Sequence, residues 1–496
     1  MKLSELSKDI ERRDSAGNMD VEVTSVTADS RMVMAGSLFV AVPGLLRDGT
    51  SFVESARKKG AVAIVAEQPV ERGECAFIEV SDARAALSQL ASASYGHPSQ
   101  KLSIVGVTGT SGKTTTTLML ESLFDATGDP VGLIGTIEYR AGDVREVADR
   151  TTPDAVVLQS WFARMVDAGV RHAAMEVSSH ALALKRTFGI RFSAAVFTNL
   201  SRDHFDFHRD FDDYFSAKAI LFDQIDRTRR SAVINEDDEW GRKLLKRMGR
   251  ESVLTYGRSD GADIRPAAGF SVSADGLHGS VVTPHGELAM HSPLLGVPNL
   301  YNWLAAIGGA LSVGIPIETI ERGIAKLQTV RGRFEKIIHD GGPMVIVDYA
   351  HKPDALEKLL HAVRDLSPGR RIVLVFGCGG ERDEGKRDLM GEIAGRLADF
   401  TVITSDNPRG EEPSSIIAQI EAGMKKAEKA SYSIVPDRRE AIEQAISSSS
   451  PDDIVLIAGK GHENYQVIAD RILHFDDREE AEAVLKGRKV VSEKGS

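Results

Sequence analysis

The chain has 496 residues and a mass of 53.7 kDa, which predicts about three domains at roughly 100–200 residues each. Hydrophobic residues make up 42% and charged residues 27%, so disordered and fibrous classes are excluded. The 61 basic and 72 acidic side chains leave a net charge of −11. That sign argues against nucleic acid or an anionic membrane surface as the main partner.

The two cysteines, Cys75 and Cys378, lie far apart in no metal-ligand spacing, which fits a reducing compartment. The N-terminal residues lack the apolar core of a signal peptide, and no run of about 18 apolar residues occurs. We therefore expect a cytoplasmic protein without membrane insertion. The expected oligomeric state is a monomer, although no motif bears on it.

Residues 1–100 alternate short apolar runs with helical stretches, which predicts a small α/β domain. The expected strands are 37–42, 61–66 and 76–80, and the expected helices are 52–59 and 83–95. Glycine, proline and polar residues then predict a linker over 95–101.

The middle of the chain has the pattern of a mostly parallel, doubly wound sheet. A strand over 102–108 leads into a Gly-rich turn and a helix over 113–126, and further strands are expected at 173–177, 194–198 and 231–235. The Gly-, Ser- and Val-rich text at 269–282 predicts antiparallel strands, and 299–313 predicts a helix.

A third block of alternating strands and helices follows, with strands expected at 344–348, 371–376, 400–404 and 454–458. The predicted fold is therefore α/β with three domains. These are a small N-terminal α/β domain over 1–100, a central domain of the P-loop ATPase type over 101–332, and a C-terminal Rossmann-like domain over 333–496.

A phosphate-binding loop lies between the first central strand and its helix. It consists of Gly109, Thr110, Ser111, Gly112, Lys113, Thr114 and Thr115. Backbone N–H groups and the helix N-terminus attract phosphate, Lys113 adds a positive charge, and the Thr114 hydroxyl can hold Mg²⁺. Val107 stands where the generic pattern has glycine. A turn that merely caps a helix is the lesser alternative, so we predict ATP or GTP binding.

This loop and nine further segments, in order, resemble the Mur ligases, ATP-dependent amide-forming enzymes of three domains. The segments are 29–31, 151–154, 176–180, 199–204, 299–302, 331–335, 348–353, 406–409 and 459–463. Folylpolyglutamate synthases share the loop but lack the first, uridine-binding domain, whereas about 100 residues precede the loop here.

The resemblance implies that ATP phosphorylates the D-Glu γ-carboxylate of UDP-MurNAc-L-Ala-D-Glu. The amine of meso-diaminopimelate then displaces phosphate from this acyl phosphate, which gives the UDP-MurNAc-tripeptide for peptidoglycan synthesis. Lys113, Glu176, His204 and Lys218 are the implied catalytic residues. Thr114 and Glu176 are implied ligands of the ATP-bound Mg²⁺, and His204 of a second Mg²⁺.

Lys218 is implied to be carbamylated by CO₂ (N6-carboxylysine), which would give an oxygen ligand near Mg²⁺. Without the resemblance, a lone Glu or His is usually structural, and a lysine in a predicted helix over 211–222 is usually a solvated charge. His204 and His208 have i, i+4 spacing, which leaves a transition-metal site as a minor alternative.

The resemblance also implies three sets of binding residues. For ATP these are the loop residues with Asn302, Arg333, Asp348 and His351. For UDP-MurNAc-L-Ala-D-Glu they are Ser30, Leu45, Leu46, Arg47, Thr151, Thr152, Ser178 and Arg186. For meso-diaminopimelate they are Arg382, Asp406, Asn407, Pro408, Arg409, Gly459 and Glu463.

Arg409 is the residue that bears on the choice of amino acid. Its guanidinium matches the second carboxylate of meso-diaminopimelate, which lysine lacks. In the family, the form Asp406-Asn407-Pro408-Arg409 accompanies diaminopimelate addition. The alternatives are the L-lysine-adding activity, a folylpolyglutamate-synthase-like ligase, a P-loop kinase or transport ATPase, and a nucleotide-sensing regulator without chemistry.

Overall fold

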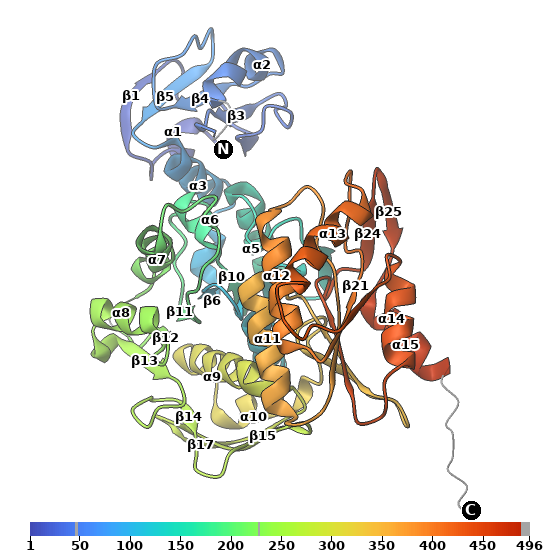
Figure 1. Ribbon diagram of the computed structural model, residues 1–496. Helices are drawn as coiled ribbons and strands as arrows, with labels where there is room; N and C mark the ends of the chain where they lie inside the picture. The colour runs from blue at the N-terminus through green and yellow to red at the C-terminus, as the bar shows by residue number, and fades with distance from the viewer. Residues whose placement is uncertain (45–47, 227–228, 488–496) are drawn as a thin grey trace, which may run out of the picture. The chain divides into compact units, whose positions relative to one another are not determined.

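The computed structural model describes residues 1–44, 48–226 and 229–487 (Figure 1). They form two compact units. Unit 1 contains Met1–Arg265, Val282–Leu288 and Tyr301–Lys326, and unit 2 contains Pro266–Val281, Ala289–Leu300 and the described residues from Leu327 onward. Leu45, Leu46 and Arg47, which we predicted to bind the uridine nucleotide, lie outside the described residues.

The N-terminal part of unit 1 is a five-stranded sheet in the order β1-β5-β4-β3-β2, in which only β1 is antiparallel to its neighbour. Its strands are β1 (Arg12–Ala16), β2 (Ser25–Thr27), β3 (Ser37–Val40), β4 (Ala63–Ala66) and β5 (Ala76–Val80). Alternate residues of the central strands pack on both faces. Leu38 and Val65 join the cluster that includes α3 (Ala83–Ser94), and Phe39 joins the cluster that includes α2 (Val53–Lys58). A short α1 (Leu3–Leu6) precedes β1. The predicted small α/β domain is therefore present.

The second sheet of unit 1 has eight strands in the order β13-β12-β11-β6-β10-β7-β8-β9. The strands are β6 (Ser103–Thr108), β7 (Val131–Ile134), β8 (Glu138–Ala141), β9 (Val144–Val147), β10 (His172–Glu176), β11 (Ala194–Phe197), β12 (Ala232–Asn235) and β13 (Val253–Tyr256). The six strands β13, β12, β11, β6, β10 and β7 are parallel to their neighbours. β8 pairs antiparallel with β7, and β9 pairs antiparallel with β8. This is the mostly parallel central sheet that the sequence predicted.

Helices cover both faces of the central sheet. One large core cluster joins β10 and β11 to α5 (Ala155–Asp167), α7 (Phe211–Ala219) and α8 (Glu239–Met248). On α9 (Gly296–Ser312), Gly309 lies against Val105 and Val196 of the sheet and Leu120 of α4 (Lys113–Asp125). The remaining helices of this part are α6 (Ser179–Ala183) and α10 (Ile317–Lys326).

A smaller four-stranded sheet is formed by β14 (Arg265–Pro266), β15 (Ser271–Ser273), β16 (Gly276–Thr283) and β17 (Gly286–Ser292). β15 and β16 pair antiparallel, as the Gly-, Ser- and Val-rich text predicted. Most of these residues cluster with unit 2, since Pro266–Val281 and Ala289–Leu300 belong to it.

Unit 2 is built on a six-stranded sheet in the order β18-β19-β23-β20-β21-β22, in which only β18 is antiparallel to its neighbour. Its strands are β18 (Glu335–Ile337), β19 (Met344–Asp348), β20 (Ile372–Phe376), β21 (Phe400–Ile403), β22 (Tyr432–Ile434) and β23 (Ile454–Ala458). A hairpin of β24 (Tyr465–Ile468) and β25 (Arg471–His474) follows.

The helices of unit 2 pack on opposite faces of this sheet. One core cluster includes α11 (Pro353–Leu366), α12 (Gly385–Leu397) and α13 (Pro413–Met424), and the other includes α14 (Arg438–Ser447) and α15 (Asp477–Gly487). This doubly covered parallel sheet is the predicted Rossmann-like block. In the described part of the chain, no helix combines the length and apolar character that crossing a bilayer needs.

Candidate active site

The phosphate loop connects β6 to α4, and two of its glycines are required by geometry. Gly109 has φ +151°, and a Cβ there would lie 1.9 Å from Thr198 Oγ1. Gly112 has φ +86° and precedes the first residue of α4, and a Cβ there would lie 2.5 Å from Asn302 Oδ1. Only glycine fits both positions. The structure therefore places Asn302, a predicted ATP-binding residue, directly against this loop.

Asn199 fixes the loop from the end of the neighbouring strand β11. Its side chain accepts from Ser111 N (3.0 Å) and donates to Ser111 O (3.1 Å), and its carbonyl accepts from Thr110 N (2.9 Å). Lys113 Nζ donates to the carbonyls of Gly109 and Thr110, both at 3.0 Å. Asn199 belongs to a segment that matches the family, but no role was predicted for it from the sequence. Its position after a predicted parallel strand was the available signal.

Glu176, the last residue of β10, is completely buried and lies at the centre of a hydrogen-bond network. Its Oε2 accepts from Thr114 Oγ1 (2.9 Å) and Thr136 Oγ1 (3.1 Å), and its Oε1 accepts from Thr136 N (2.7 Å). Because β10 lies between β6 and β7, the loop after each neighbouring strand reaches this carboxylate. Thr136 was missed from the sequence, since it carries no motif of its own.

Four of the residues predicted to bind the muramoyl peptide are linked to Glu176, through its backbone carbonyl or through Thr136. Thr151 Oγ1 lies 3.0 Å from Thr136 Oγ1. Thr152 Oγ1 donates to Glu176 O (2.9 Å) and accepts from Ser178 N (3.1 Å), and Arg186 Nη1 donates to Thr152 O (2.8 Å). The phosphate loop and the predicted peptide-binding residues are thus joined through Glu176 and Thr136.

Lys218 is 1% exposed on α7, although a helix lysine is normally solvated. Its Nζ donates to Gly109 O at 2.7 Å and lies 4.4 Å from the centre of the Tyr214 ring. Burial, and then the nearby positive charge of Lys113, hold the pKa of this amine well below its usual value, against the opposing effect of Asp203. The structure therefore brings Lys218 to the phosphate loop as a desolvated amine.

His204 has φ +57°, the left-handed region that non-glycine residues seldom adopt. Its ring packs edge-on against His180, with centroids 4.7 Å apart, and lies 6.2 Å from the ring of Tyr214. The Tyr214 hydroxyl in turn lies 3.2 Å from Thr110 Oγ1. His204 therefore reaches the loop through Tyr214 and sits on His180, and neither of these two residues was predicted.

The side chains around Glu176 fit a magnesium ion. Thr114 and Glu176 present a hydroxyl and a carboxylate oxygen that lie 2.9 Å apart beside a phosphate loop, and Mg²⁺ prefers oxygen ligands next to phosphates. Among the described residues, no group of three or more His, Cys, Asp and Glu side chains has metal-ligand spacing. Of the two histidines with i, i+4 spacing, His204 and His208, the second is engaged elsewhere, because His208 Nε2 lies 2.9 Å from Ser179 Oγ.

In unit 2, three predicted ATP-binding residues gather around Tyr349. The Arg333 guanidinium lies 4.5 Å from the Tyr349 ring centre, and the His351 ring lies 4.6 Å from it. Asp348 accepts from Phe334 N and Ala350 N, both at 2.8 Å. Burial raises the pKa of Asp348, opposed by Arg333, and burial lowers the pKa of His351 to about 4. Tyr349 was not predicted, although it belongs to a matching segment.

The predicted amino-acid-binding residues also gather, at the carboxyl ends of β20, β21 and β23. Asn407 Nδ2 donates to Glu463 Oε2 (3.0 Å), and the fully buried Lys460 donates to both Asn407 Oδ1 (3.3 Å) and Glu463 Oε2 (3.4 Å). Gly459 has φ +118°, and a Cβ there would lie 2.8 Å from Asp406 Oδ2. Burial raises the pKa of Glu463, opposed by Lys460.

Arg409 and Arg382 flank Gly379 in the same cluster. A Cβ on Gly379 would lie 3.0 Å from Arg409 Nη1 and 3.7 Å from Arg382 Cγ. Arg409 has φ +54°, and its Nη1 donates to Gly380 O at 2.8 Å. The left-handed backbone at Arg409 costs roughly 1–3 kcal/mol, a kind of strain that clusters at functional sites. Pro408, between Asn407 and Arg409, is buried.

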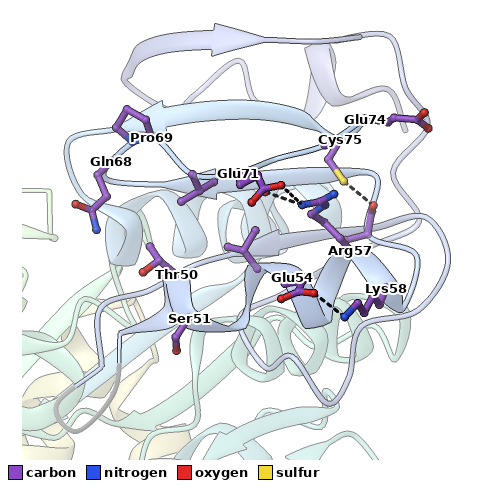
Figure 2. Close-up of a pocket in the computed structure, with 14 residues that line it drawn as sticks. Thr50, Ser51, Glu54, Arg57, Lys58, Gln68, Pro69, Glu71, Glu74 and Cys75 are labelled. Carbon is purple, nitrogen blue, oxygen red and sulfur yellow. Dashed lines mark hydrogen bonds and ion pairs between the residues drawn. The ribbon is translucent and has the colours of Figure 1, made fainter.

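The N-terminal sheet carries Ser30, whose carbonyl accepts from Lys59 Nζ at 2.8 Å. A separate open depression of about 1020 Å³ lies between α2 and the loop that joins β4 to β5 (Figure 2). Its basic residues are already engaged: Lys58 pairs with Glu54 at 2.6 Å, and Arg57 donates to Glu71 O at 2.9 Å. Ser30 is not among the described residues that line it.

Comparison with known proteins agrees with this geometry. Three family models match in chain order: "Mur ligase family, catalytic domain" over residues 22–95, "Mur ligase middle domain" over 107–310, and "Mur ligase, glutamate ligase domain" over 332–461. Two relatives are both named UDP-N-acetylmuramoyl-L-alanyl-D-glutamate--2,6-diaminopimelate ligase. The protein of Geobacter metallireducens is 43% identical over 98% of each chain. That of Thermosynechococcus vestitus is 46% identical over 95% of this chain and 94% of its own.

A solved structure with that same enzyme name superposes with a TM-score of 0.71 and 32% identity, over 98% of this chain and 99% of its own. The fold and the phosphate loop define an ATP-using α/β ligase of three domains. The chain belongs to the Mur ligase family.

Proposed function

We propose that this protein ligates meso-diaminopimelate to the D-Glu γ-carboxylate of UDP-MurNAc-L-Ala-D-Glu at the expense of ATP. The observation that carries the proposal is the shared carboxylate of Glu176, which bonds Thr114 of the phosphate loop and, through Thr136, the predicted peptide residue Thr151. A nucleotide loop and a substrate loop that meet at one acid suit phosphoryl transfer to a bound carboxylate. The names of the close relatives support the choice of substrates.

The loop residues have distinct roles in the proposed phosphorylation. The N–H groups of Gly112 and its neighbours and the N-terminus of α4 hold the ATP phosphates, and Lys113 neutralises the charge that develops on the transferred group. Thr114 and Glu176 would hold the Mg²⁺ of ATP, with His204 at a second ion. Bound Mg²⁺ supplies charge neutralisation between two anionic reactants.

Lys218 is proposed to carry a carbamate. CO₂ reacts with an unprotonated amine, and the lowered pKa of the buried Lys218 favours that form. Carbamylation of the neutral amine forms an N–C bond to CO₂ and releases one proton, so a neutral buried group becomes an anion with two oxygens. Lys218 Nζ lies beside Gly109 of the loop, where such an anion would attract a divalent cation.

Thr151, Thr152, Ser178 and Arg186 are proposed to hold the muramoyl peptide, with Ser30 and residues 45–47 on the uridine nucleotide. Asn302, Arg333, Asp348 and His351 are proposed to bind ATP. Unit 2 is proposed to bind the incoming amino acid through Arg382, residues 406–409, Gly459 and Glu463. The domain assignment, with 1–100, 101–332 and 333–496 serving these three tasks, belongs to the proposal, as do a cytoplasmic location and a monomeric state.

Arg409 is proposed to select meso-diaminopimelate by pairing with its second carboxylate. Nη1 is engaged by Gly380 O, and the described residues provide no other hydrogen-bond partner for its fork beyond Asn407 O at 3.4 Å. A guanidinium presents parallel N–H groups that match a carboxylate. L-Lysine would bring no carboxylate to this arginine and would leave its charge uncompensated.

One reaction tests the proposal. The protein is incubated with ATP, Mg²⁺, UDP-MurNAc-L-Ala-D-Glu and either meso-diaminopimelate or L-lysine, and the products are identified by mass. The expected result is tripeptide with diaminopimelate, together with ADP and phosphate. Preference for L-lysine would overturn the role of Arg409, and no product with any diamino acid would overturn the ligase itself.

A further inference from the structure

Arg387 is a completely buried arginine that lies beneath the loops predicted to bind the amino acid. It belongs to the first turns of α12 and is 0% exposed. Nη1 lies 2.9 Å from Glu411 Oε2 and donates to Gln419 Oε1 at 3.1 Å. Nη2 donates to Glu411 Oε1 at 3.0 Å and to Gly379 O at 3.2 Å. The guanidinium and the Glu411 carboxylate thus form two parallel hydrogen bonds, a strong and directional arrangement.

Glu411 completes a link between two loops. Its Oε1 also accepts from the backbone N–H of Glu381, and its own N–H donates to Pro408 O at 3.1 Å. The two backbones touch, because a Cβ on Gly380 would lie 1.9 Å from Pro408 O. The Arg387–Glu411 pair therefore joins loop 379–382, which carries Arg382, to loop 406–411, which carries Arg409.

Both loops adopt backbone conformations that need support. Glu381 has φ +53° and Arg409 has φ +54°, and side chains make this left-handed region unfavourable. Glu381 is held by its N–H bond to Glu411, and Arg409 by donation from its N–H to Val467 O at 3.1 Å and from Ala469 N to its carbonyl at 2.7 Å. Strained residues persist only where their surroundings fix them.

Stability alone does not account for this pair. The Arg387 side chain is fully buried and that of Glu411 is 26% exposed, and replacing even a fully buried ion pair by apolar residues of similar size is often neutral or stabilising. One atom of the pair, Arg387 Nε, is buried without a hydrogen-bond partner in the described structure, which further lowers its value as a stabilising contact. What the pair does provide is a fixed relation between two loops that each carry a selecting arginine.

We propose that Arg387 and Glu411 are positioning residues that set the spacing and direction of Arg382 and Arg409, and so determine selection of an amino acid with a second carboxylate. This inference rests on the proposed function, because it deepens the amino-acid site described above. Neither residue touches the substrate in the proposal. Both act through the loops that they join.

The test compares steady-state kinetics of the wild type with four variants in the full-length protein. Glu411→Gln removes the negative charge but keeps the shape, and Arg387→Lys keeps the positive charge but loses the fork. The double variant Arg387→Met with Glu411→Gln removes both charges, so that no buried charge is left uncompensated. Glu357→Gln is the matched control, since it removes a Glu–Arg pair between α11 and α12, from Glu357 to Arg396 at 3.1 Å, and neither residue belongs to the two loops.

The three loop-pair variants should raise the KM for meso-diaminopimelate about 10- to 100-fold, because small displacements of a positioning group cost this much. The preference for meso-diaminopimelate over L-lysine should fall by a similar factor, while kcat and the KM for ATP and for UDP-MurNAc-L-Ala-D-Glu stay within about twofold. The loss in the double variant should be smaller than the product of the losses in the two single variants, since all three disrupt the same Arg387–Glu411 pair. The control should match the wild type.

Two outcomes would overturn the inference. An unchanged KM and an unchanged preference in the double variant, with a wild-type melting temperature, would show that the pair does not position the loops. Equal losses toward all three substrates would show a merely structural role. The wild type is assayed with meso-diaminopimelate before any variant is compared. Failure of the wild type to use this amino acid would refute the proposed function itself.

Discussion

The phosphate-loop site of unit 1 and the amino-acid cluster of unit 2 are both built at the carboxyl ends of three neighbouring parallel strands, but they are held together differently. In unit 1, strand order does the positioning: β10 lies between β6 and β7, so Glu176 meets Thr114 on one side and Thr136 on the other. The contacts are hydroxyl and backbone N–H donors on one carboxylate.

In unit 2, the loops after β20, β21 and β23 are held by charged groups beneath them. The two completely buried arginines of the described chain, Arg387 and Arg438, both lie here. Arg438 donates to Ser405 O (3.3 Å) and Ala458 O (3.1 Å) and pairs with the buried Asp477 at 2.7 Å. Arg387 holds the loops that carry Arg382 and Arg409. In the proposed phosphorylation site the side chains are therefore positioned by the order of the strands, whereas in the proposed amino-acid site they are positioned by loops that need their own supports.

The largest effect should come from Lys218→Ala. If unit 1 works through oxygen ligands gathered at the loop, loss of the carbamate should lower kcat by about 1000-fold or more, since removal of one charge-stabilising group costs about 10²–10³ in kcat. Kinetics with and without added bicarbonate or short carboxylates measure the loss and its rescue. Lys243→Ala is the control, because that lysine pairs with Asp212 near the surface. Full activity of Lys218→Ala would refute the role of Lys218.

Glu176→Gln should come next. The change keeps the size of the side chain but removes the charge shared by Thr114 and Thr136, so kcat should fall about 100-fold and the Mg²⁺ concentration for half-maximal rate should rise. A Mg²⁺ titration of the ligation rate checks this. Glu138→Gln, which breaks a pair with Arg145 at 2.7 Å, should leave both quantities unchanged. An unaltered Mg²⁺ requirement in Glu176→Gln would show that the Glu176 carboxylate in unit 1 does not hold the metal ion.

Arg409→Ala tests the selecting loops of unit 2. The KM for meso-diaminopimelate should rise about 30-fold or more, with a smaller effect on kcat, because a charge-assisted pair with a carboxylate contributes about 2 kcal/mol or more. Ligation of meso-diaminopimelate and L-lysine is compared in the wild type, in Arg409→Ala, and in Arg439→Ala, whose arginine pairs with Glu480 elsewhere in the unit. If Arg409→Ala keeps the wild-type preference for meso-diaminopimelate over L-lysine, residues other than Arg409 select the amino acid.

The smallest expected effect concerns pH and unit 2. The pKa of His351 is lowered from 6.5 to about 4, first of all by burial, so the folded state binds a proton less readily than the unfolded one. Stability from this neutral histidine is complete above pH 6.5 and is lost as pH falls toward 4. Between pH 7 and pH 5 the loss should be about 2 kcal/mol.

Urea unfolding of the wild type and of His351→Asn at both pH values measures that loss, which should be smaller in the variant. His474→Asn is the contrasting change. Glu479 raises the pKa of His474, so any stability that it contributes is present at low pH and is lost as pH rises. The same dependence in His351→Asn as in the wild type would show that His351 is not the group responsible.

Much of the fold could be predicted because its strands are buried on both faces. The runs 76–80, 344–348 and 454–458 coincide with β5, β19 and β23, since an uninterrupted apolar, β-branched run is typical of a covered parallel strand. β1 was not predicted. Its residues Arg12–Ala16 are almost all exposed, and only antiparallel pairing with β5 makes them a strand. The hairpin of β24 and β25 was missed for the same reason.

The candidate site shows a similar division. The loop motif by itself predicts Lys113 and Thr114 as site residues. The family resemblance was needed to predict Glu176, Lys218 and Arg409. The roles given to these residues stay predictions. Thr136, Arg387 and Glu411 had no local signal, because each acts on a residue distant in sequence through a contact that only the folded chain creates. Asn199 and Tyr349 lie in matching segments, but their contacts also depend on the fold.

The sequence by itself determined the α/β class, the phosphate loop and membership of the ligase family, because these depend on local periodicity and on ordered short motifs. The tertiary structure alone decided which hydroxyl groups donate to one shared carboxylate, which lysine is buried away from water, and which arginines lie beneath a loop. Burial and neighbouring charge set those properties, and both arise only when strands far apart in the chain are laid side by side.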